Sequence, residues 1–300
     1  MRRSVRTDLA LEARQLWQEQ DASLTSLPGV RASEEQYGNF CVSTVEILDS
    51  EGENALGKPV GKYITLELDG LLHREENAFS DAASLFSRQL KTLAPVSADG
   101  SYLVVGLGNR DITPDAIGPE AVDHVLVTRH LKQLLPEDFV QFQMVSAVCS
   151  GVLGTTGIES SDLVRALVEK IQPTLVFAID ALAARELNRL CRTVQIADTG
   201  IIPGSGVGNA RQALNHQTLG VPVIAIGVPT VVDAVTLTAD LASQAGISFD
   251  PHSLHGSGEM IVTPRDIDKR VKDIGKLIGY GLNLFFHAGL TLEDIDMLLS

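Results

Sequence analysis

Tyr102-Leu-Val-Val-Gly-Leu-Gly-Asn109 is the stretch that decides the fold. Its apolar run ends in Gly-Leu-Gly-Asn, which is typical of a buried parallel strand that breaks into a loop at its carboxyl end. The chain continues through Thr113-Pro-Asp115 toward an amphipathic helix. Ligands and chemistry gather at the carboxyl ends of strands in open α/β sheets, so Asp115 is a candidate functional carboxylate.

A second apolar run, Leu175-Val-Phe-Ala-Ile-Asp180-Ala-Leu182, also presents a carboxylate where a strand is expected to end. A carboxylate that follows buried aliphatic residues must be paired, hydrogen-bonded, metal-bound or altered in its pKa. An ion pair between Asp180 and Arg185 is the structural alternative to a functional role. For Asp115 the alternative is a turn carboxylate that binds its own backbone.

If both Asp115 and Asp180 face one cleft, two chemistries are open. The two carboxylates could share a proton and activate a water for amide hydrolysis, with their pKa values split apart. They could instead ligate a metal ion, which normally needs a third donor such as His. His252 and His255 come closest to a ligand spacing, but they lie in a Gly/Ser-rich connector where solvated side chains are expected.

Apolar strands alternate with amphipathic helices along most of the chain. This alternation predicts an α/β fold, a mostly parallel twisted sheet with helices on both faces. Strands are predicted near 41–48, 61–68, 102–108, 139–148, 175–180, 193–198 and 222–227. Helices are predicted up to residue 20 after a cap at Thr7 or Asp8, near 78–94, 118–135, 159–172, 230–245 and 263–287, and after Thr291.

Residues 1–300 are expected to form a single domain. The composition, 44% hydrophobic and 21% charged, allows a sizeable core. The strands within 25–75 alternate apolar and polar residues, so they are expected to be accessory strands with one exposed face. Residues 246–262 read as an irregular connector to the C-terminal helices.

The net charge of −14 argues against nucleic acid as a partner, because an acidic surface repels phosphate backbones. No segment predicts a secretory signal or a membrane span; the most apolar long region, 221–245, carries two prolines and two aspartates. The three cysteines, Cys41, Cys149 and Cys191, form no metal pair or disulfide framework, and buried structural roles are expected for the last two. These features favour a cytoplasmic protein.

Gly204-Ser-Gly206-Val-Gly208 resembles a phosphate-binding loop only loosely. It lacks both the Gly-x-Gly-x-x-Gly spacing and the Lys-Ser/Thr of a P-loop, and Gly106-Leu-Gly108 lacks a third glycine in register. A nucleotide-binding oxidoreductase is therefore a distant alternative. The loop at 204–208 is expected instead to allow a close backbone approach at or near the cleft.

Several segments together resemble the germination protease family of spore-forming bacteria, from one end of the chain to the other. They are Ser4-Val-Arg-Thr-Asp-Leu-Ala10, Val105-Gly-Leu-Gly-Asn109, Thr113-Pro-Asp-Ala-Ile-Gly-Pro119, Thr128-Arg-His130, Ala178-Ile-Asp-Ala-Leu-Ala-Ala-Arg185, Gln195-Ile-Ala-Asp-Thr-Gly200, Pro203-Gly-Ser-Gly-Val-Gly-Asn209, Gly220 to Ala234 and Met260-Ile-Val-Thr-Pro264. The family's fold is similar to that of hydrogenase maturation proteases, which hold nickel with the help of a His.

The resemblance implies that Asp115 and Asp180 are the catalytic carboxylates of an aspartic-type endopeptidase. No His here matches the nickel-ligand motif, so neither a metal nor another cofactor is implied. The glycines Gly204, Gly206 and Gly208 are expected to contact substrate. A nickel-dependent maturation-type peptidase and a catalytically silent binding protein of the same fold are the alternatives.

The resemblance further implies a role in spore germination. The substrates would be small acid-soluble spore proteins in the cytoplasm of the spore core, and the enzyme would be a homotetramer. It would be made as a zymogen that removes a short propeptide, residues 1–8, by a cut near Asp8 and Leu9.

Overall fold

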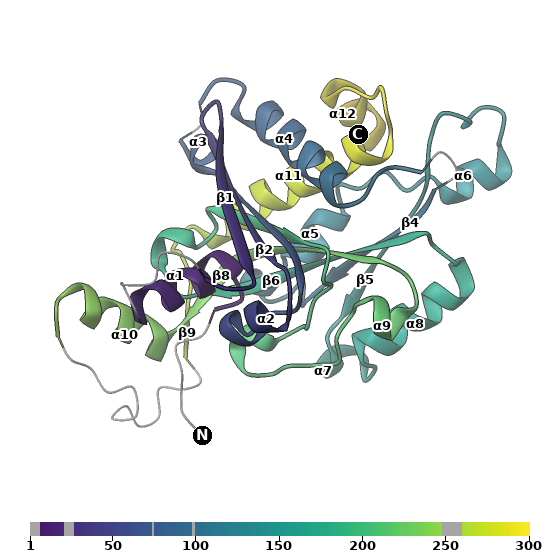
Figure 1. Ribbon diagram of the computed structural model, residues 1–300. Coiled ribbons are helices and arrows are strands. Elements are labelled where there is room, and N and C mark those ends of the chain that lie inside the picture. The colour runs from purple at the N-terminus through teal and green to yellow at the C-terminus, as the bar shows by residue number, and fades with distance from the viewer. Residues whose placement is uncertain (1–6, 21–26, 74, 98–99, 248–259) are drawn as a thin grey trace.

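The chain folds around one β-sheet that runs through the molecule, with helices on either side (Figure 1). The computed structural model describes residues 7–20, 27–73, 75–97, 100–247 and 260–300. Within these ranges the strand order is β1-β2-β3-β7-β8-β6-β4-β5, and β9 pairs with β8. The strands are β1 (Val30–Tyr37), β2 (Phe40–Ile47), β3 (Gly61–Glu67), β4 (Ser101–Leu107), β5 (Met144–Gly151), β6 (Leu175–Ala184), β7 (Thr193–Ala197), β8 (Val223–Asp233) and β9 (Ile261–Val262).

Four strands form the parallel half of the sheet. β4 pairs with both β5 and β6, and β6 pairs with β8, all in parallel register. Successive residues of β4, such as Val104 and Val105, are both fully buried. Burial on both faces explains why these strands read as continuous apolar runs rather than alternating ones. The predicted α/β fold class is confirmed.

The other half of the sheet is antiparallel, so the sheet as a whole is mixed rather than mostly parallel. β1, β2, β3 and β7 follow one another in antiparallel register, and both β7 and β9 pair antiparallel with β8. The short connection between β6 and β7 explains this. Residues 185–192 hold only a 3₁₀ turn at Leu187–Arg189, whereas a parallel crossover needs a dozen or more residues.

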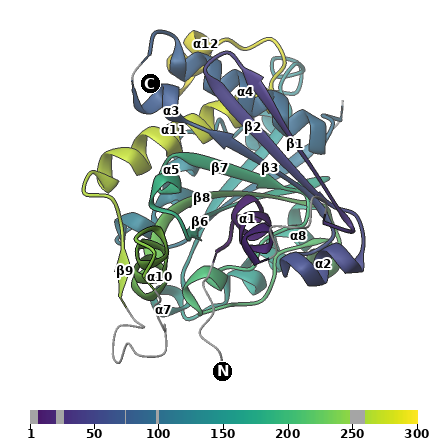
Figure 2. The same cartoon turned by 60° about the vertical axis from the view of Figure 1, so that its left-hand side comes forward.

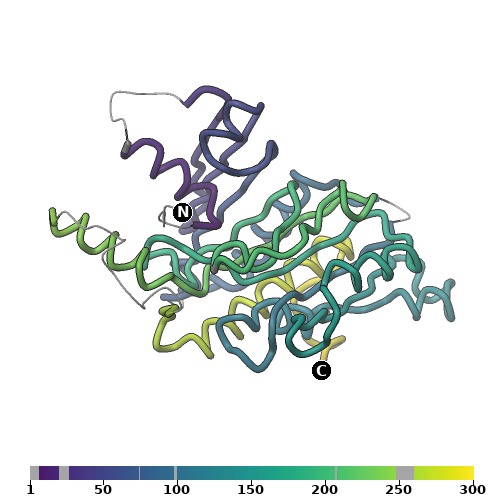
Figure 3. Tube along the Cα trace, turned by 90° about the horizontal axis from the view of Figure 1, so that it is seen from below, coloured from purple at the N-terminus to yellow at the C-terminus, as the bar shows by residue number. Residues whose placement is uncertain are grey.

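Helices cover both faces of the sheet (Figures 2 and 3). On one face, α4, α5 and α11 pack against a large apolar cluster with Val104, Phe177 and Ile226. On the other face lie α8 and α9 near β4 and β6, and α1 and α2 near β2 and β3. The helices are α1 (Ala10–Gln20), α2 (Ser50–Leu56), α3 (Asp69–Leu72), α4 (Ala78–Leu93), α5 (Ile117–Val122), α6 (Arg129–Leu134), α7 (Leu153–Thr156), α8 (Ser160–Ile171), α9 (His216–Leu219), α10 (Ala234–Gln244), α11 (Ile267–Phe286) and α12 (Leu292–Leu299).

An aromatic cluster joins the long helix α11 to the centre of the sheet. Tyr102 of β4 and Phe177 of β6 contact Phe285 and Phe286 of α11, with ring centroids 4.9–6.2 Å apart. Buried aromatic pairs at this separation add to the stabilisation that comes from area burial alone. This packing holds the two strands that carry the candidate site against a rigid helix.

The helix predicted near 118–135 is two short helices, α5 and α6. The side chain of Asn283 replaces helical hydrogen bonds at the break: its Oδ1 accepts from the amide of Leu126, and its Nδ2 donates to the carbonyl of His124, both at 2.9 Å. Asn283 is fully buried in α11. A residue 157 positions away along the chain therefore ends the helix, and local periodicity could not predict this.

Other boundaries differ by smaller amounts. β8 extends to Asp233, so the helix expected from residue 230 begins at Ala234, and β5 begins at Met144 rather than near 139. Strand β1 and helix α2 were not predicted. The cap at Thr291 is confirmed, since its Oγ1 accepts from the amide of Asp294. Among the described residues, no helix is both long and apolar enough to cross a membrane.

Candidate active site

Asp115 lies in the loop that follows β4. A 3₁₀ turn over Thr113–Asp115 folds this loop back over the strand end. The amide of Asn109 donates to Asp115 Oδ2 at 2.8 Å, and Gly108, at φ 99°, leaves no room for a Cβ beside the Asp115 carbonyl. The carboxylate therefore accepts from the backbone of another residue and is held just beyond the end of β4.

Asp180 lies inside β6 rather than at its end, because β6 continues to Ala184 alongside the long strand β8. Its other neighbour stops earlier: the pairing with β4 ends at Gly106 and Ile179. Asp180 is thus the first residue of β6 beyond the register shared with β4. Its side chain is only 5% exposed, and its Oδ1 accepts from the amide of Ala181 at 2.9 Å.

The ion pair considered between Asp180 and Arg185 is absent. The guanidinium of Arg185 instead contacts Glu19 at 2.9 Å and Asp240 at 3.4 Å. Arg185 lies in the bend that follows the last residue of β6, and its side chain is held there by these two carboxylates. Among the described residues, Asp180 therefore has no cation to compensate for its burial.

Asp115 and Asp180 line the same cleft, which has a volume of about 490 Å³. Its walls come from the ends of β4 and β5, from β6 and β8, and from the loop after β7. Residues that share it with the two carboxylates include Asp8, Gly151, Ser160, Gly204, Arg211 and Thr230. The hydroxyl of Thr230 donates to the carbonyl of Pro114 at 2.6 Å, which ties the Asp115 loop to β8.

The two carboxyls differ in their electrostatic environments. Burial raises the pKa of Asp180 well above its usual value, and the nearby charge of Asp115 raises it further. Burial also raises the pKa of Asp115, but the hydrogen bond from the Asn109 amide opposes this effect. Asp180 is therefore the better site for a proton, and Asp115 the better site for the negative charge. Carboxyl pairs divided in this way supply one acid and one base.

The glycine loop lies beside the two carboxylates. Gly204 and Gly206 line the cleft, whereas Gly208 lines the neighbouring cavity. A Cβ on Gly206 would lie 2.0 Å from Asp8 Oδ2 and 2.6 Å from the Cβ of Ala183. The close approach expected at the glycine loop is therefore present: Asp8 of the N-terminal segment lies directly against Gly206.

That segment lines the cleft with Asp8 and is anchored on β6. Asp8 Oδ1 accepts from the hydroxyl of Ser205 at 2.9 Å, while Leu9 is fully buried against Leu182 and Val232. The Thr7 hydroxyl accepts from the amide of Leu9 at 3.0 Å, one residue before α1 begins. The first amide of the helix, that of Ala10, instead donates to Gln195 Oε1 at 2.8 Å, so a side chain of β7 takes the place of the cap predicted at Thr7 or Asp8. Residues 1–6 of the expected propeptide lie outside the described residues.

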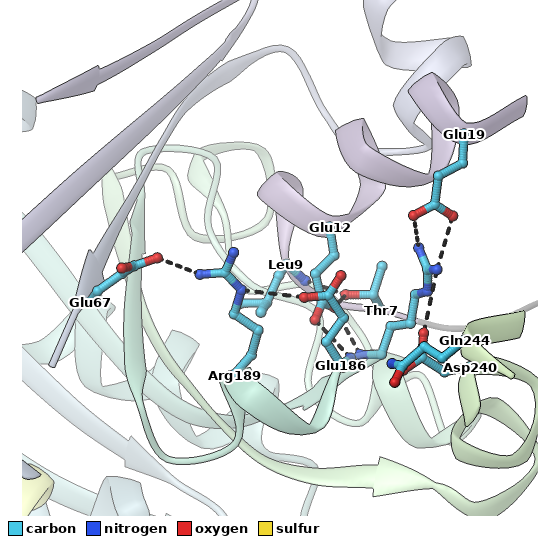
Figure 4. A network of polar contacts seen from close by, with 10 residues as sticks. Thr7, Leu9, Glu12, Glu19, Glu67, Glu186, Arg189, Asp240 and Gln244 are labelled. Atoms are coloured by element: carbon cyan, nitrogen blue, oxygen red, sulfur yellow. Dashed lines mark hydrogen bonds and ion pairs between the residues drawn. The ribbon is translucent and has the colours of Figure 1, made fainter. Parts of the chain in front are cut away.

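Glu12 forms the second anchor of this segment, and the sequence offered no sign of it. Its carboxylate is fully buried and accepts from the amides of Arg185 and Glu186 at 2.8 and 3.0 Å, and from the hydroxyl of Thr7 (Figure 4). A Glu in an amphipathic helix is normally read as a solvated residue. Glu12 becomes a buried hydrogen-bond acceptor only because α1 packs against the end of β6 in the folded protein.

Within the described residues, no group of three or more His, Cys, Asp or Glu side chains is placed to hold a metal ion. The cleft brings together carboxylates without an imidazole, so the donor set does not match the His-containing nickel site. His252 and His255 lie outside the described residues. The prediction of a buried Cys149 was wrong: it is exposed at the end of β5, where its Sγ lies 3.7 Å from Arg110 Nη2, while Cys191 is buried as expected.

Comparison with known proteins gives one consistent result. The family model for germination proteases matches residues 10–244. The germination protease of Caldanaerobacter subterraneus subsp. tengcongensis is 43% identical over 98% of both chains. That of Clostridium tetani is 39% identical over 99% of this chain and all of its own length, and that of Bacillus cereus is 48% identical over 79% of this chain and 65% of its own. Among solved structures, the [NiFe] hydrogenase maturation protease HycI of Thermococcus kodakarensis is 17% identical, with a TM-score of 0.36 over 65% of this chain and 98% of that chain.

The sequence matches define the class of the protein as a peptidase, a hydrolase of peptide bonds. Within that class, the chain belongs to the germination protease family.

Proposed function

We propose that this protein is an aspartic-type endopeptidase that initiates the degradation of small acid-soluble spore proteins during germination. The observation that carries the proposal is the shared cleft, in which Asp115 and Asp180 have unequal environments. The substrate class rests on the family and on the sequence resemblance. The spore-core cytoplasm is the corresponding location.

The proposed reaction divides the work between the two carboxyls. Ionised Asp115 takes a proton from a water molecule as the water oxygen attacks the carbonyl carbon of the substrate. Protonated Asp180 donates its proton to the carbonyl oxygen and stabilises the tetrahedral intermediate. As the C–N bond breaks, the proton held by Asp115 passes to the leaving amine, and one hydroxyl of the intermediate returns its proton to Asp180 as the carbonyl re-forms. General acid and base catalysis of this kind typically contributes about 10²–10⁴-fold to the rate.

A self-processing zymogen is part of the same proposal, with the cut between Asp8 and Leu9. Its support is the position of Asp8 in the cleft with Asp115 and Asp180. Burial of Leu9 among Leu182 and Val232 would keep the new N-terminus anchored after cleavage. Mass spectrometry of the stored protein tests this step, because loss of the first eight residues gives one defined mass.

We also propose that residues 1–300 act as one peptidase domain and that the enzyme assembles as a homotetramer. Sedimentation velocity tests the assembly, since a tetramer has about four times the 32.1 kDa mass of the chain. Limited proteolysis tests the domain organisation, because a single domain is expected to lose only terminal or loop segments before it unfolds.

The decisive experiment follows an α/β-type small acid-soluble spore protein and the enzyme together by intact-mass spectrometry, with and without chelator. Asp115→Asn and Asp180→Asn are each expected to abolish cleavage. Asp268→Asn, which alters an exposed carboxylate on α11, is the matched control and should retain full activity.

Each outcome distinguishes one alternative. Cleavage that resists chelator and disappears in both variants supports the aspartic-type reaction. Cleavage that chelator abolishes favours a metal-dependent peptidase. Self-processing without cleavage of the spore protein means that the peptidase has another substrate. If neither protein is cut under any condition, the proposal fails in favour of a binding protein of the same fold.

A further inference from the structure

Strand β8 contains an extra residue beside the cleft. Pro229 pairs with Leu182 of β6. The next residue of β6 pairs with Val231, which leaves Thr230 as the additional residue of a β-bulge. A proline suits this position, because it cannot donate to the ladder and is found within sheets mainly at edges and bulges. Bulges occur preferentially next to active sites, where they redirect a side chain.

The bulge exchanges the two faces of β8. Before it, Val228 packs into the apolar cluster on the α11 side of the sheet. After it, Val232 packs with Leu182 in a cluster that shares Ile201 with the clusters on the opposite face. Residues an even number apart stay on one face of a regular strand, so the extra residue causes the change. It also directs the hydroxyl of Thr230 toward the loop that carries the candidate base.

This hydroxyl holds one end of the peptide group between Pro114 and Asp115. Thr230 is fully buried, and its Oγ1 donates to the carbonyl of Pro114 at 2.6 Å. At the other end of the same peptide group, the amide of Asp115 donates to the carbonyl of Ile112 at 2.7 Å. Because a peptide group is planar, these two hydrogen bonds together fix the direction from which the chain enters Asp115.

The bulge itself is held from outside the pairing of β6 with β8. The amide of Cys191 donates to the carbonyl of Pro229 at 2.6 Å, and Thr263 Oγ1 donates to the carbonyl of Thr230 at 2.8 Å. Thr263 lies between β9 and α11. The carbonyls of both bulge residues are therefore bonded to distant segments, and the Thr230 hydroxyl is presented from a braced backbone.

We propose that Thr230 is a positioning residue that orients Asp115 for its reaction, and that Thr263 supports it by holding the bulge. The inference rests on the proposed function, since it takes Asp115 as the general base. Thr230 acts through the carbonyl of Pro114 and needs no contact with the substrate. A reacting group misplaced by about 1 Å can lose about 10²-fold in rate, so a contact that fixes the preceding peptide group has a direct kinetic effect.

The test compares variants that differ in the hydroxyl group. Thr230→Val keeps the branched shape but cannot donate, and it is expected to lower kcat for cleavage of an α/β-type small acid-soluble spore protein by about 10- to 100-fold, with KM within about twofold. Thr230→Ser should recover most of this loss, and Thr263→Val should show a smaller loss. Thr238→Val removes a hydroxyl that donates to the carbonyl of Ala234 within α10; it is the matched control and should retain the wild-type rate.

The pH profile separates positioning from a loss of stability. The hydrogen bond from the amide of Asn109 opposes the rise that burial causes in the pKa of Asp115. A displaced loop weakens that bond, so the pKa of Asp115 rises. Asp115 must be ionised to act as a base, and the acidic limb of kcat should therefore move to higher pH in Thr230→Val and return in Thr230→Ser. If the limb stays in place, and kcat per folded molecule equals that of the wild type, the proposal is wrong; thermal unfolding supplies the folded fraction.

Hydrogen exchange gives a measurement that does not depend on catalysis. The amides of Asn109 and Asp115 should exchange faster in Thr230→Val than in Thr230→Ser or Thr238→Val. Unchanged exchange in Thr230→Val would show that its hydroxyl does not hold the loop, whatever the enzyme cuts. If exchange responds as expected but the wild-type protein cleaves neither itself nor the spore protein, Thr230 orients the loop and the proposed peptidase reaction fails.

Discussion

Asp8 and Ala183 exchange two hydrogen bonds across 175 residues of sequence: the amide of Asp8 donates to the carbonyl of Ala183, and the amide of Ala183 donates to Asp8 Oδ2, both at 2.9 Å. Ala183 lies three residues beyond Asp180 on β6. The pairing between β4 and β6 ends at Ile179, so β4 does not cover this part of the strand edge. The N-terminal segment therefore caps a free strand edge next to the two candidate catalytic carboxylates.

Asp180→Asn is expected to change how stability depends on pH. The pKa of Asp180 is raised in the folded state, so protonation favours the folded protein. This contribution is complete below the unfolded pKa of about 4 and is lost as pH rises through the folded pKa. The variant should thus gain stability relative to the wild type as pH rises from 4 to 8. Urea unfolding at several pH values measures the difference, and a constant difference would contradict the burial argument.

Gly206→Ala should loosen the N-terminal segment. The added Cβ meets Asp8 Oδ2 and Ala183 Cβ at distances that require one of them to move. A destabilisation of about 1–3 kcal/mol is expected for overpacking of this kind, with faster hydrogen exchange at residues 8–12. Gly154→Ala is the matched control, because it lines the same cleft with open space around its Cα. Equal hydrogen-exchange rates at residues 8–12 in the two variants would show that the position of Asp8 does not depend on its close contact with Gly206.

Glu12→Gln should destabilise the protein by about 1–3 kcal/mol. The Glu12 carboxylate accepts from two backbone amides and one hydroxyl, and an amide group places a donor where one of these acceptor oxygens was. Chemical denaturation measures the loss. Glu53→Gln, at an exposed position of α2, is the control and should stay within about 0.5 kcal/mol of the wild type. A similarly small effect at Glu12 would mean that the helix is held mainly by apolar contacts.

His287 should make the folded protein sensitive to acid. Its imidazole is 2% exposed at the end of α11, and burial lowers its pKa to about 4. The folded state therefore favours neutral imidazole, and stability falls as pH drops from the unfolded pKa of about 6.5 toward 4, by up to roughly 3 kcal/mol.

His287→Gln should remove this part of the pH dependence, since an amide oxygen can still accept from the amide of Gln143 and does not titrate. His130→Gln, at an exposed position of α6, serves as the comparison and should leave the profile unchanged. Unfolding free energies at pH 7.5, 6 and 4.5 provide the measurement. If the unfolding free energy of both variants and of the wild type depends on pH in the same way, His287 is not the cause of the acid sensitivity.

The candidate carboxylates could be found from the sequence because each belongs to a contiguous pattern. Asp115 follows the break of β4, and Asp180 follows five buried residues of β6. Apolar runs and the glycines or carboxylates that interrupt them are local features, which can be recognised along a few residues even where, as at Asp180, the strand continues. Most strands and the long helices α4, α8 and α11 were predicted for the same reason.

The misread elements depend on residues far apart in the sequence. Asn283 divides the helix predicted near 118–135, and β7 pairs antiparallel with β3, a strand from much earlier in the chain. The burial of Glu12 likewise requires β6, which begins more than 160 residues later. Each case is a choice of partner, and local sequence does not encode the identity of a partner.

The sequence by itself therefore determined the α/β class and the family, and it identified the two candidate carboxylates, because alternating periodicity, strand breaks and matched segments can all be found along the chain without knowing its contacts. Only the tertiary structure decided that Asp115 and Asp180 share one cleft, and that Asp8 lines the same cleft while bonded to Ala183 of β6. The physical reason is burial. The pKa of a carboxyl group shifts, and a polar group needs a hydrogen-bond partner within the protein, only when segments from elsewhere in the chain exclude water from it.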